Sequence, residues 1–201
     1  PADHMIGFLA SSLLRDGGTL QIGIGSLGSA LTYSACLRHQ DNATYRALAE
    51  ALDLHRRFPA SARDGGLEPF AQGLYGCSEM LVDGFLHLYR AGILKREVFD
   101  DAALQELLNA GEIELEVNPK LLDTLQRQQL IGSALRETEV EWLKRFGIFQ
   151  ADVEWRDGQL WVDGQQIAPQ LDEPPARATI EAHCLGERLQ GGIIAHGGFF
   201  V

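Results

Sequence analysis

The spacing of apolar residues predicts that helices and buried strands alternate along the first half of the chain. Apolar residues recur at helical spacing in four segments, residues 4–14, 27–37, 45–54 and 83–91. Short apolar runs at 19–24 and 74–78 are typical of buried strands, and residues 55–69 are predicted to form a loop. This alternation indicates an α/β protein with helices flanking a mostly parallel sheet.

The second half of the chain is predicted to contain an inserted region. The pattern predicts a helix over 100–110, a strand over 112–117, a helix that begins at Asn118-Pro119, a capping box at Thr138–Glu141 and a hairpin over 152–163. A helix from Pro174 to Leu189 and a final strand after Gly191-Gly192 follow. The expected organisation is an α/β core over 1–110, a helical and β-hairpin insertion over 111–172, and a helix and strand over 173–201 that return to the core sheet.

The composition is that of a globular chain with a marked acidic balance. Hydrophobic residues make up 45% of the 201 residues, and the formal net charge is −11. This charge repels polyanions, so we expect neither nucleic acid nor an anionic membrane as a partner. No stretch approaches the about 18 apolar residues that a membrane span needs.

The cysteine content and the two chain ends add three expectations. Cys36, Cys77 and Cys184 are too few for a disulfide scaffold and lack the spacing of a metal site, so we expect no metal and a cytoplasmic location. The chain starts with proline and stops in an apolar run that is typical of a strand. We therefore expect it to be a segment of a longer polypeptide.

A glycine turn at residues 23–28 has the form G-x-G-x-x-G and stands between a predicted strand and a predicted helix. A dinucleotide site would need a second strand that ends in an acidic residue about 20 residues later. The acidic residue in that window, Asp53, lies in a helical pattern instead. Two interpretations remain: a tight turn without a ligand, or a helix N-terminus whose free N–H groups bind an anion.

Three segments together resemble the acetyl-CoA hydrolase/transferase family of CoA-transferases. They are LQIGIGSLGSAL, LYGCSEMLVDGFLHLYRAGIL and GGIIAHGGFF, and the likeness is close over residues 5–35, 73–95 and 180–200. The resemblance implies a CoA-transferase type of α/β fold. It also implies an enzyme that moves CoA between carboxylic acids or hydrolyses acyl-CoA, with coenzyme A as part of the substrate and a small carboxylate or water as acceptor.

The family mechanism uses a glutamate that becomes a glutamyl-CoA thioester, and the resemblance implies that this residue is missing here. In the family the nucleophile lies on an L-E-V-D strand after the G-F-F strand, so we expect it beyond Val201, in the remaining half of the polypeptide. Leu115-Glu116-Val117 mimics that strand but precedes the G-F-F segment, so Glu116 is interpreted as a solvent-facing strand residue. No catalytic residue is therefore assigned, and the chain alone is expected to be inactive.

The resemblance implies a set of residues that bind the substrate and its CoA moiety: Gly23, Gly25, Ser26, Ser78, Glu79, Gly197 and Gly198. Glu79 is expected just after a strand, where it either positions the substrate near the acyl group or has a structural role. That role would be a salt bridge or a carboxylate at a helix start, which the helix dipole favours. Asp83 is expected to cap the helix that follows.

Other residues have both a functional and a structural interpretation. Cys77 is interpreted as a core thiol, and His196 either faces the cleft or is a buried, hydrogen-bonded histidine. The basic cluster of Arg56, Arg57 and Arg63 either binds CoA phosphates or lies on a solvated loop. The three tryptophans, at positions 142, 155 and 161, are expected to form a small satellite core.

Three alternatives to an acyl-CoA enzyme stay open at this point. They are a nucleotide-binding oxidoreductase domain, a non-catalytic member of the resembling family, and a structural scaffold with only a partner-docking face. The sequence does not decide between transferase and hydrolase, and a homodimer is also left open.

Overall fold

The computed structural model describes residues 2–200 and divides the chain into two compact units. Unit 1 comprises the described residues up to Val98 together with those from Ile193 onward, and unit 2 comprises Phe99–Gly192. The predicted boundaries at 110/111 and 172/173 differ from these, because the helices on either side of the insertion belong to unit 2.

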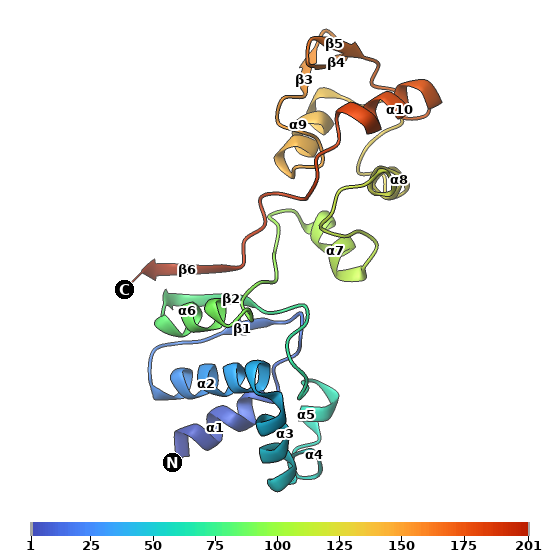
Figure 1. The fold of residues 1–201 in the computed structure, drawn as a ribbon. Coiled ribbons are helices and arrows are strands. Elements are labelled where there is room, and N and C mark those ends of the chain that lie inside the picture. Colours follow the sequence, from blue (N-terminus) through green and yellow to red (C-terminus); the bar gives the residue numbers. More distant parts are fainter. Residues whose placement is uncertain (1, 201) are drawn as a thin grey trace. The chain divides into compact units, whose positions relative to one another are not determined.

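Unit 1 is an α/β unit (Figure 1). Its helices are α1 (Ala2–Ser11), α2 (Ser26–Gln40), α3 (Asn42–Ala51), α4 (Leu54–Arg57), α5 (Ala60–Arg63) and α6 (Asp83–Arg90). Its strands are β1 (Thr19–Gln21), β2 (Tyr75–Leu81) and β6 (Ala195–Phe200). The predicted loop over 55–69 is wrong in part, since it contains α4 and α5.

The three strands form one parallel sheet in the order β1-β2-β6. Gln21 pairs with Cys77, and Cys77 in turn pairs with His196. The parallel sheet expected from the alternating pattern is therefore present. It brings together segments that are more than 50 and more than 110 residues apart in the chain.

Helices cover the face of the sheet on which Leu20 and Gly76 lie. Leu20 is buried beside Gly76, and a Cβ atom at residue 76 would come within 2.5 Å of the ring of Phe85 on α6. In the helical layer Gly7 lets α1 approach α2, since a Cβ atom there would lie 2.5 Å from the carbonyl carbon of Ala30. Side chains alternate along a strand, so Cys77 and Glu79 lie on the opposite face.

The carboxylate of Asp16 joins the entry to β1 to the entry to β2. It accepts hydrogen bonds from the backbone N–H groups of Gly17, Ala71, Gln72 and Gly73, at 2.8–3.1 Å. Four donors on one carboxylate fix both segments. The register of the two strands follows from this anchor.

Arg38 on α2 is a second polar residue that connects separate segments through hydrogen bonds, and it is only 2% exposed. Its guanidinium donates to the carbonyl oxygens of Ser11, Leu14 and Glu68 and lies 4.2 Å from the ring centroid of Phe70. Burial lowers the pKa of this guanidinium. Arg38 thus fixes α2 to the end of α1 and to the segment before β2.

Unit 2 has its own helices and a small antiparallel sheet (Figure 1). The helices are α7 (Ala102–Ala110), α8 (Pro119–Arg127), α9 (Glu137–Arg145) and α10 (Pro174–His183). The strands are β3 (Glu154–Arg156), β4 (Gln159–Val162) and β5 (Gln165–Ile167). The predicted hairpin around Asp157-Gly158 is confirmed, and a second Asp-Gly turn at 163–164 adds β5.

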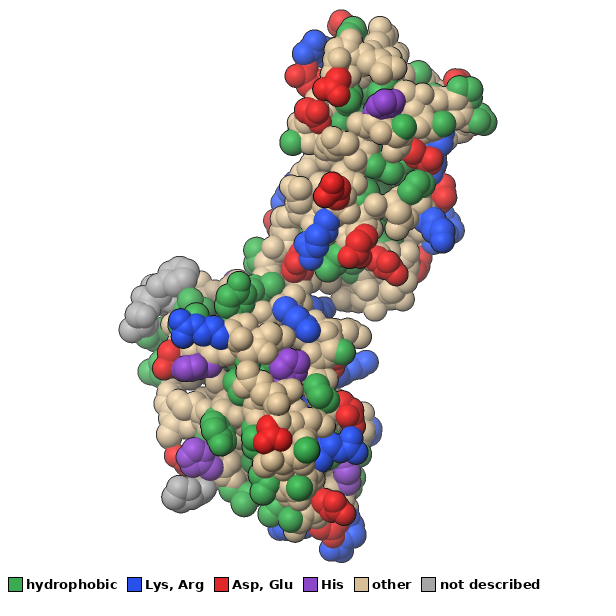
Figure 2. Space-filling view, viewed as in Figure 1, with side chains coloured by type: hydrophobic (Ala, Val, Ile, Leu, Met, Phe, Trp, Pro, Cys, Tyr) green, Lys and Arg blue, Asp and Glu red, His purple; other side chains and the backbone are tan. Residues whose placement is uncertain are grey.

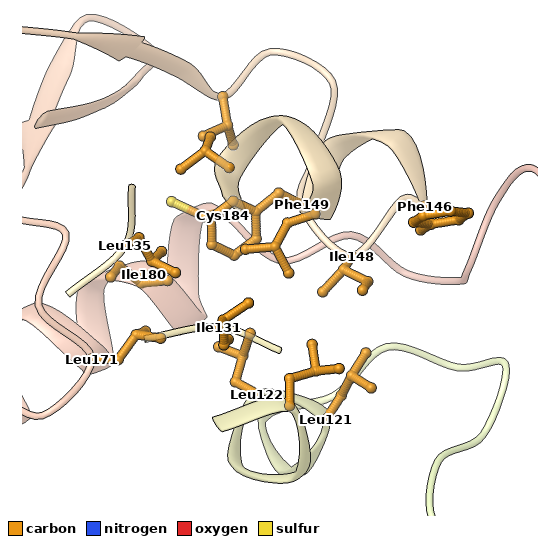
Figure 3. Packing of buried hydrophobic residues seen from close by; sticks show 14 of the residues in the cluster. Leu121, Leu122, Ile131, Leu135, Phe146, Ile148, Phe149, Leu171, Ile180 and Cys184 are labelled. Carbon is orange, nitrogen blue, oxygen red and sulfur yellow. The ribbon is translucent and has the colours of Figure 1, made fainter. Parts of the chain in front are cut away.

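The core of unit 2 is a large apolar cluster rather than a satellite. Figure 3 shows Leu121, Leu122, Ile148 and Phe149 in it, with the Cys184 thiol near Phe149. Trp142 and Trp155 pack against this cluster, so the expected separate tryptophan core is wrong. Burial is the main cause that raises the pKa of the Cys184 thiol to about 12, and it keeps this thiol protonated.

Helix ends in unit 2 follow the sequence signals in part. Asn118 accepts a hydrogen bond from the N–H of Lys120, as the Asn-Pro pair predicts. The capping box lies two residues earlier than predicted, because Glu139 accepts from the N–H of Arg136. The predicted strand over 112–117 is wrong: the only β-bridge in this segment of the described chain joins Glu116 to Arg188, and Glu116 is solvent-exposed.

The last helix of unit 2 is shorter than predicted and ends at His183 instead of Leu189. The segment after it pairs with unit 2 in extended form, where Phe149 bridges to Leu185. This tertiary pairing overrides the helical spacing of the apolar residues.

Replacing Asp16 by asparagine should destabilise unit 1. The amide NH₂ group would stand in place of one carboxylate oxygen, and it cannot accept the hydrogen bonds that the backbone N–H groups donate to that oxygen. We expect a loss of about 1–3 kcal/mol in the free energy of unfolding. Amide hydrogen exchange of the Tyr75–Leu81 peptides should accelerate. Tryptophan fluorescence should not change, since all three tryptophans lie in unit 2. Unchanged exchange in β2 would contradict the anchoring role.

Replacing Glu139 by glutamine should destabilise unit 2 in a pH-dependent way. Burial alone would raise the pKa of Glu139. Hydrogen bonds from the Arg136 side chain and from the N–H groups of Arg136 and Gly132 outweigh burial and lower this pKa. The stabilisation by the charged form is therefore present at neutral pH and is lost as the pH falls through the folded-state pKa.

Urea unfolding followed by tryptophan fluorescence checks this prediction. The E139Q variant should be less stable by about 1–3 kcal/mol at pH 7, and the difference should shrink as the pH is lowered below 4. A difference that stays constant over this pH range would show that the charge of Glu139 is not what stabilises the unit.

Candidate functional site

The glycine turn follows β1 and leads into α2. Gly25 is the residue before the helix and has φ +121°, a conformation that favours glycine. Gly28 packs against the turn, since a Cβ atom there would lie 2.5 Å from the carbonyl oxygen of Gly23. No side chain caps the start of α2 at Gly25, and Ser26 is exposed. The first N–H groups of α2 are thus left without a side-chain acceptor at the cap.

A cavity of about 110 Å³, here called the turn cavity, lies at this glycine turn. It is lined by the turn residues Ile22–Gly25, by the first turns of α2, and by Val82, Asp83 and Gly84 at the start of α6. Gly23 and Gly25 thus line a real cavity, together with the beginning of a second helix.

A larger cavity of about 460 Å³, here called the helix groove, lies between α2 and α6. From α2 it is lined by Ser29, Thr32, Tyr33, Cys36 and Gln40. From α6 and the residue after it, it is lined by Asp83, Gly84, His87, Arg90 and Ala91. The turn cavity and the helix groove share Ser29, Thr32, Asp83 and Gly84, so the two spaces adjoin.

Thr32 lies where the two cavities meet and is only 4% exposed. Its hydroxyl is the one buried side-chain N or O atom of the described residues that has no hydrogen-bond partner. A Cβ atom at residue 84 would lie 2.8 Å from this hydroxyl, so Gly84 leaves the space beside it clear. A buried hydroxyl without a partner costs about 1–3 kcal/mol.

Ser78 and Glu79 both lie on β2, but only Ser78 bonds to the segment that leads into the glycine turn. The Ser78 hydroxyl donates to the carbonyl oxygen of Ile22 at 2.7 Å and thereby fixes the end of β1. Glu79 was expected after the strand, but β2 continues to Leu81, so Glu79 lies within it. Its exposed side chain lies on the face of the sheet away from the helices. It lines neither the turn cavity nor the helix groove.

Gly197 and Gly198 lie on β6 next to Ser78 and Glu79. A Cβ atom at residue 197 would come within 3.3 Å of the Ser78 carbonyl oxygen, and one at residue 198 within 3.2 Å of the Glu79 carbonyl oxygen. Neither glycine lines the turn cavity or the helix groove. The predicted site residues of β2 and β6 therefore lie on adjacent strands, but they do not all lie on the same face of the sheet.

Asp83 does not cap α6, contrary to the prediction. It is the first residue of the helix, while Val82 occupies the cap position without a side-chain hydrogen bond. The Asp83 carboxylate instead lines both cavities. The sequence analysis also missed Thr32, His87 and Arg90. One signal for the groove was available: polar or small residues recur at helical spacing on α2, at positions 29, 32, 36 and 40.

His196 and Cys77 lie on the face of the sheet away from the helices. His196 is exposed, and its Nδ1 atom lies 2.5 Å from the Tyr75 hydroxyl oxygen. Burial raises the pKa of Tyr75, with a further contribution from Cys77. Cys77 is half-buried and in register with His196. The interpretation of His196 as a buried histidine is therefore wrong.

The basic cluster on α4 and α5 is solvated. Arg56 pairs with Asp53, and Arg63 pairs with Asp64 at 2.6 Å. Helix α3, rather than a strand, follows α2, and Asp53 lies between α3 and α4. The strand context of a dinucleotide fingerprint is thus missing from this segment.

Two searches of the described residues found no further type of site. Among residues 2–200, no group of three or more His, Cys, Asp or Glu side chains is arranged to hold a metal ion. Within the same part of the chain, no helix combines the length and apolar character that crossing a membrane requires.

Comparisons of the chain with family models, with curated proteins and with solved structures gave no significant match.

Replacing Gly25 by alanine should disturb the glycine turn, whereas the same change at Gly23 should be tolerated. Both Cβ atoms would meet open space, but only Gly25 has a positive φ. We expect G25A to lower the free energy of unfolding of unit 1 by about 1–3 kcal/mol, and G23A by much less.

Hydrogen exchange of peptides from α2 measures this difference in the full chain. Faster exchange in G25A and wild-type exchange in G23A are expected. Equal exchange in the two variants would show that the backbone conformation at Gly25 does not constrain the turn.

Proposed function

We propose that this chain forms part of an acyl-CoA transferase or hydrolase. The substrate would be acetyl-CoA or a similar short acyl-CoA, and the acceptor would be a small carboxylate or water. A glutamate outside these residues would attack the thioester carbonyl and displace the CoA thiolate, which gives a mixed anhydride. The thiolate would then attack the glutamyl carbonyl and release the acid, so that a glutamyl-CoA thioester forms.

The observation that carries this proposal is how the three resembling segments come together. They are far apart in the sequence, yet β1, β2 and β6 are neighbours in one parallel sheet. Most of unit 2, which has its own core, lies between the second and the third region of close likeness. Ligands of open α/β sheets bind outside the carboxyl ends of the strands, and the glycine turn lies at the end of β1.

The glycine turn has a chemical role in this proposal. N–H groups at the start of α2, next to a backbone without side chains at Gly23 and Gly25, would donate to the oxygen that becomes negative when the thioester is attacked. Glu79 lies on the neighbouring strand but faces away from the helices, so it would take no part at the glycine turn. Ser78 supports the arrangement because its hydroxyl bonds the carbonyl oxygen of Ile22.

Calorimetric titration of the full chain with CoA, acetyl-CoA, NAD⁺ and FAD tests the proposal. We expect CoA and acetyl-CoA to bind and the dinucleotides not to bind. Chromatographic assay of acetyl-CoA should show no turnover by the chain alone. Binding of NAD⁺ or FAD without CoA binding would favour an oxidoreductase domain. Robust hydrolysis that is abolished in Glu79→Ala would contradict an external nucleophile.

A further inference from the structure

The helix groove is not accounted for by the glycine turn chemistry. It extends from Ser29 to Gln40 along α2, which corresponds to roughly 16 Å. Both α2 and α6 begin at the turn cavity, so the groove runs from the glycine turn toward the C-terminal ends of the two helices. Any long ligand in it has one end at the turn and the other near Arg90.

The charges along α6 differ at the two ends of the groove. Asp83 lies at the end next to the glycine turn, whereas His87 and Arg90 lie toward the other end. None of the three side chains forms an ion pair or hydrogen bond with another described residue. Figure 2 shows Lys or Arg and His side chains over α6. The charges of these side chains attract an anionic group to the Arg90 end and repel it from Asp83.

The α2 wall of the groove carries hydrogen-bonding side chains. Ser29, Thr32, Tyr33 and Gln40 line it, and Tyr33 is 62% exposed. The unpartnered Thr32 hydroxyl lies at the junction with the turn cavity. Burial raises the pKa of the Cys36 thiol, which thus stays neutral and adds no charge to the wall.

We infer that the helix groove binds the phosphopantetheine part of CoA. The phosphate end lies at Arg90 and His87, and the thiol end lies at the glycine turn. This inference rests on the proposed function. The arm carries two amides and a hydroxyl and matches an extended peptide of about four residues, roughly 13–14 Å long, so it fits the groove length. An amide or hydroxyl of the arm supplies the partner that Thr32 lacks.

Titration of the full chain with 4′-phosphopantetheine and with pantetheine tests the inference. The phosphorylated arm should bind roughly tenfold more tightly than pantetheine, because only it has a phosphate for Arg90. The variant Arg90→Ala should remove this difference and leave the affinity for pantetheine unchanged. Arg63→Ala is the matched control, since it removes an exposed arginine from the basic cluster of the same unit and should change neither affinity.

The variant Thr32→Val separates ligand binding from folding. It removes the hydroxyl and keeps the shape, so stability without ligand should stay the same or rise, because a buried polar group without a partner is lost. The affinity for pantetheine should fall by a few-fold. A variant that merely unfolds would lose stability as well, which thermal unfolding measures.

The outcomes distinguish the inference from the proposed function. If CoA binds and neither Arg90→Ala nor Thr32→Val changes its affinity, CoA binds elsewhere and the inference is wrong while the proposed function stands. If Arg63→Ala weakens CoA binding instead, the phosphates lie at the basic cluster. If neither CoA nor 4′-phosphopantetheine binds at millimolar concentration, both proposals fail. Arg90-dependent binding of 4′-phosphopantetheine by a chain whose complete polypeptide shows no thioester chemistry would support the inference alone.

Discussion

The carboxylate of Asp16 is the constraint on which the arrangement of unit 1 depends. It collects N–H groups from the segment before β1 and from the segment before β2, and so sets where both strands begin. With the starts fixed, the parallel register brings Ile22 to the Ser78 hydroxyl and leaves the glycine turn beside the start of α6. Arg38 fixes the helix that follows the turn, and the cavities lie between elements that are held at both ends.

The sheet of unit 1 separates two kinds of surface. On the helical face, the glycine turn, Thr32 and Asp83 line connected cavities. On the other face, Glu79 and His196 are exposed on neighbouring strands. The insertion folds around its own core and leaves this sheet continuous.

Sequence periodicity predicted the α/β class, the parallel sheet and the elements around the glycine turn, because these depend on local spacing. Periodicity failed where pairing with distant segments determines the backbone conformation. Residues 112–117 alternate like a strand but make only one β-bridge among the described residues. The last predicted helix ends at His183 instead of Leu189. The site was predicted in part. Gly23 and Gly25 do line a cavity, but the groove residues Thr32 and Arg90 lie on helices whose shared face only the fold reveals. Glu79 was predicted after the strand, but β2 continues to Leu81. The alternation of side chains along β2 places Glu79 on the face away from the helices.

Hydrogen exchange of the full chain, measured with and without saturating CoA, tests the central claim that CoA binds at the glycine turn and between α2 and α6. We expect slower exchange in peptides that cover Ile22–Thr32 and Val82–Ala91, and no change within Phe99–Gly192. Protection confined to unit 2, or CoA binding that leaves both segments of unit 1 unprotected, would contradict it.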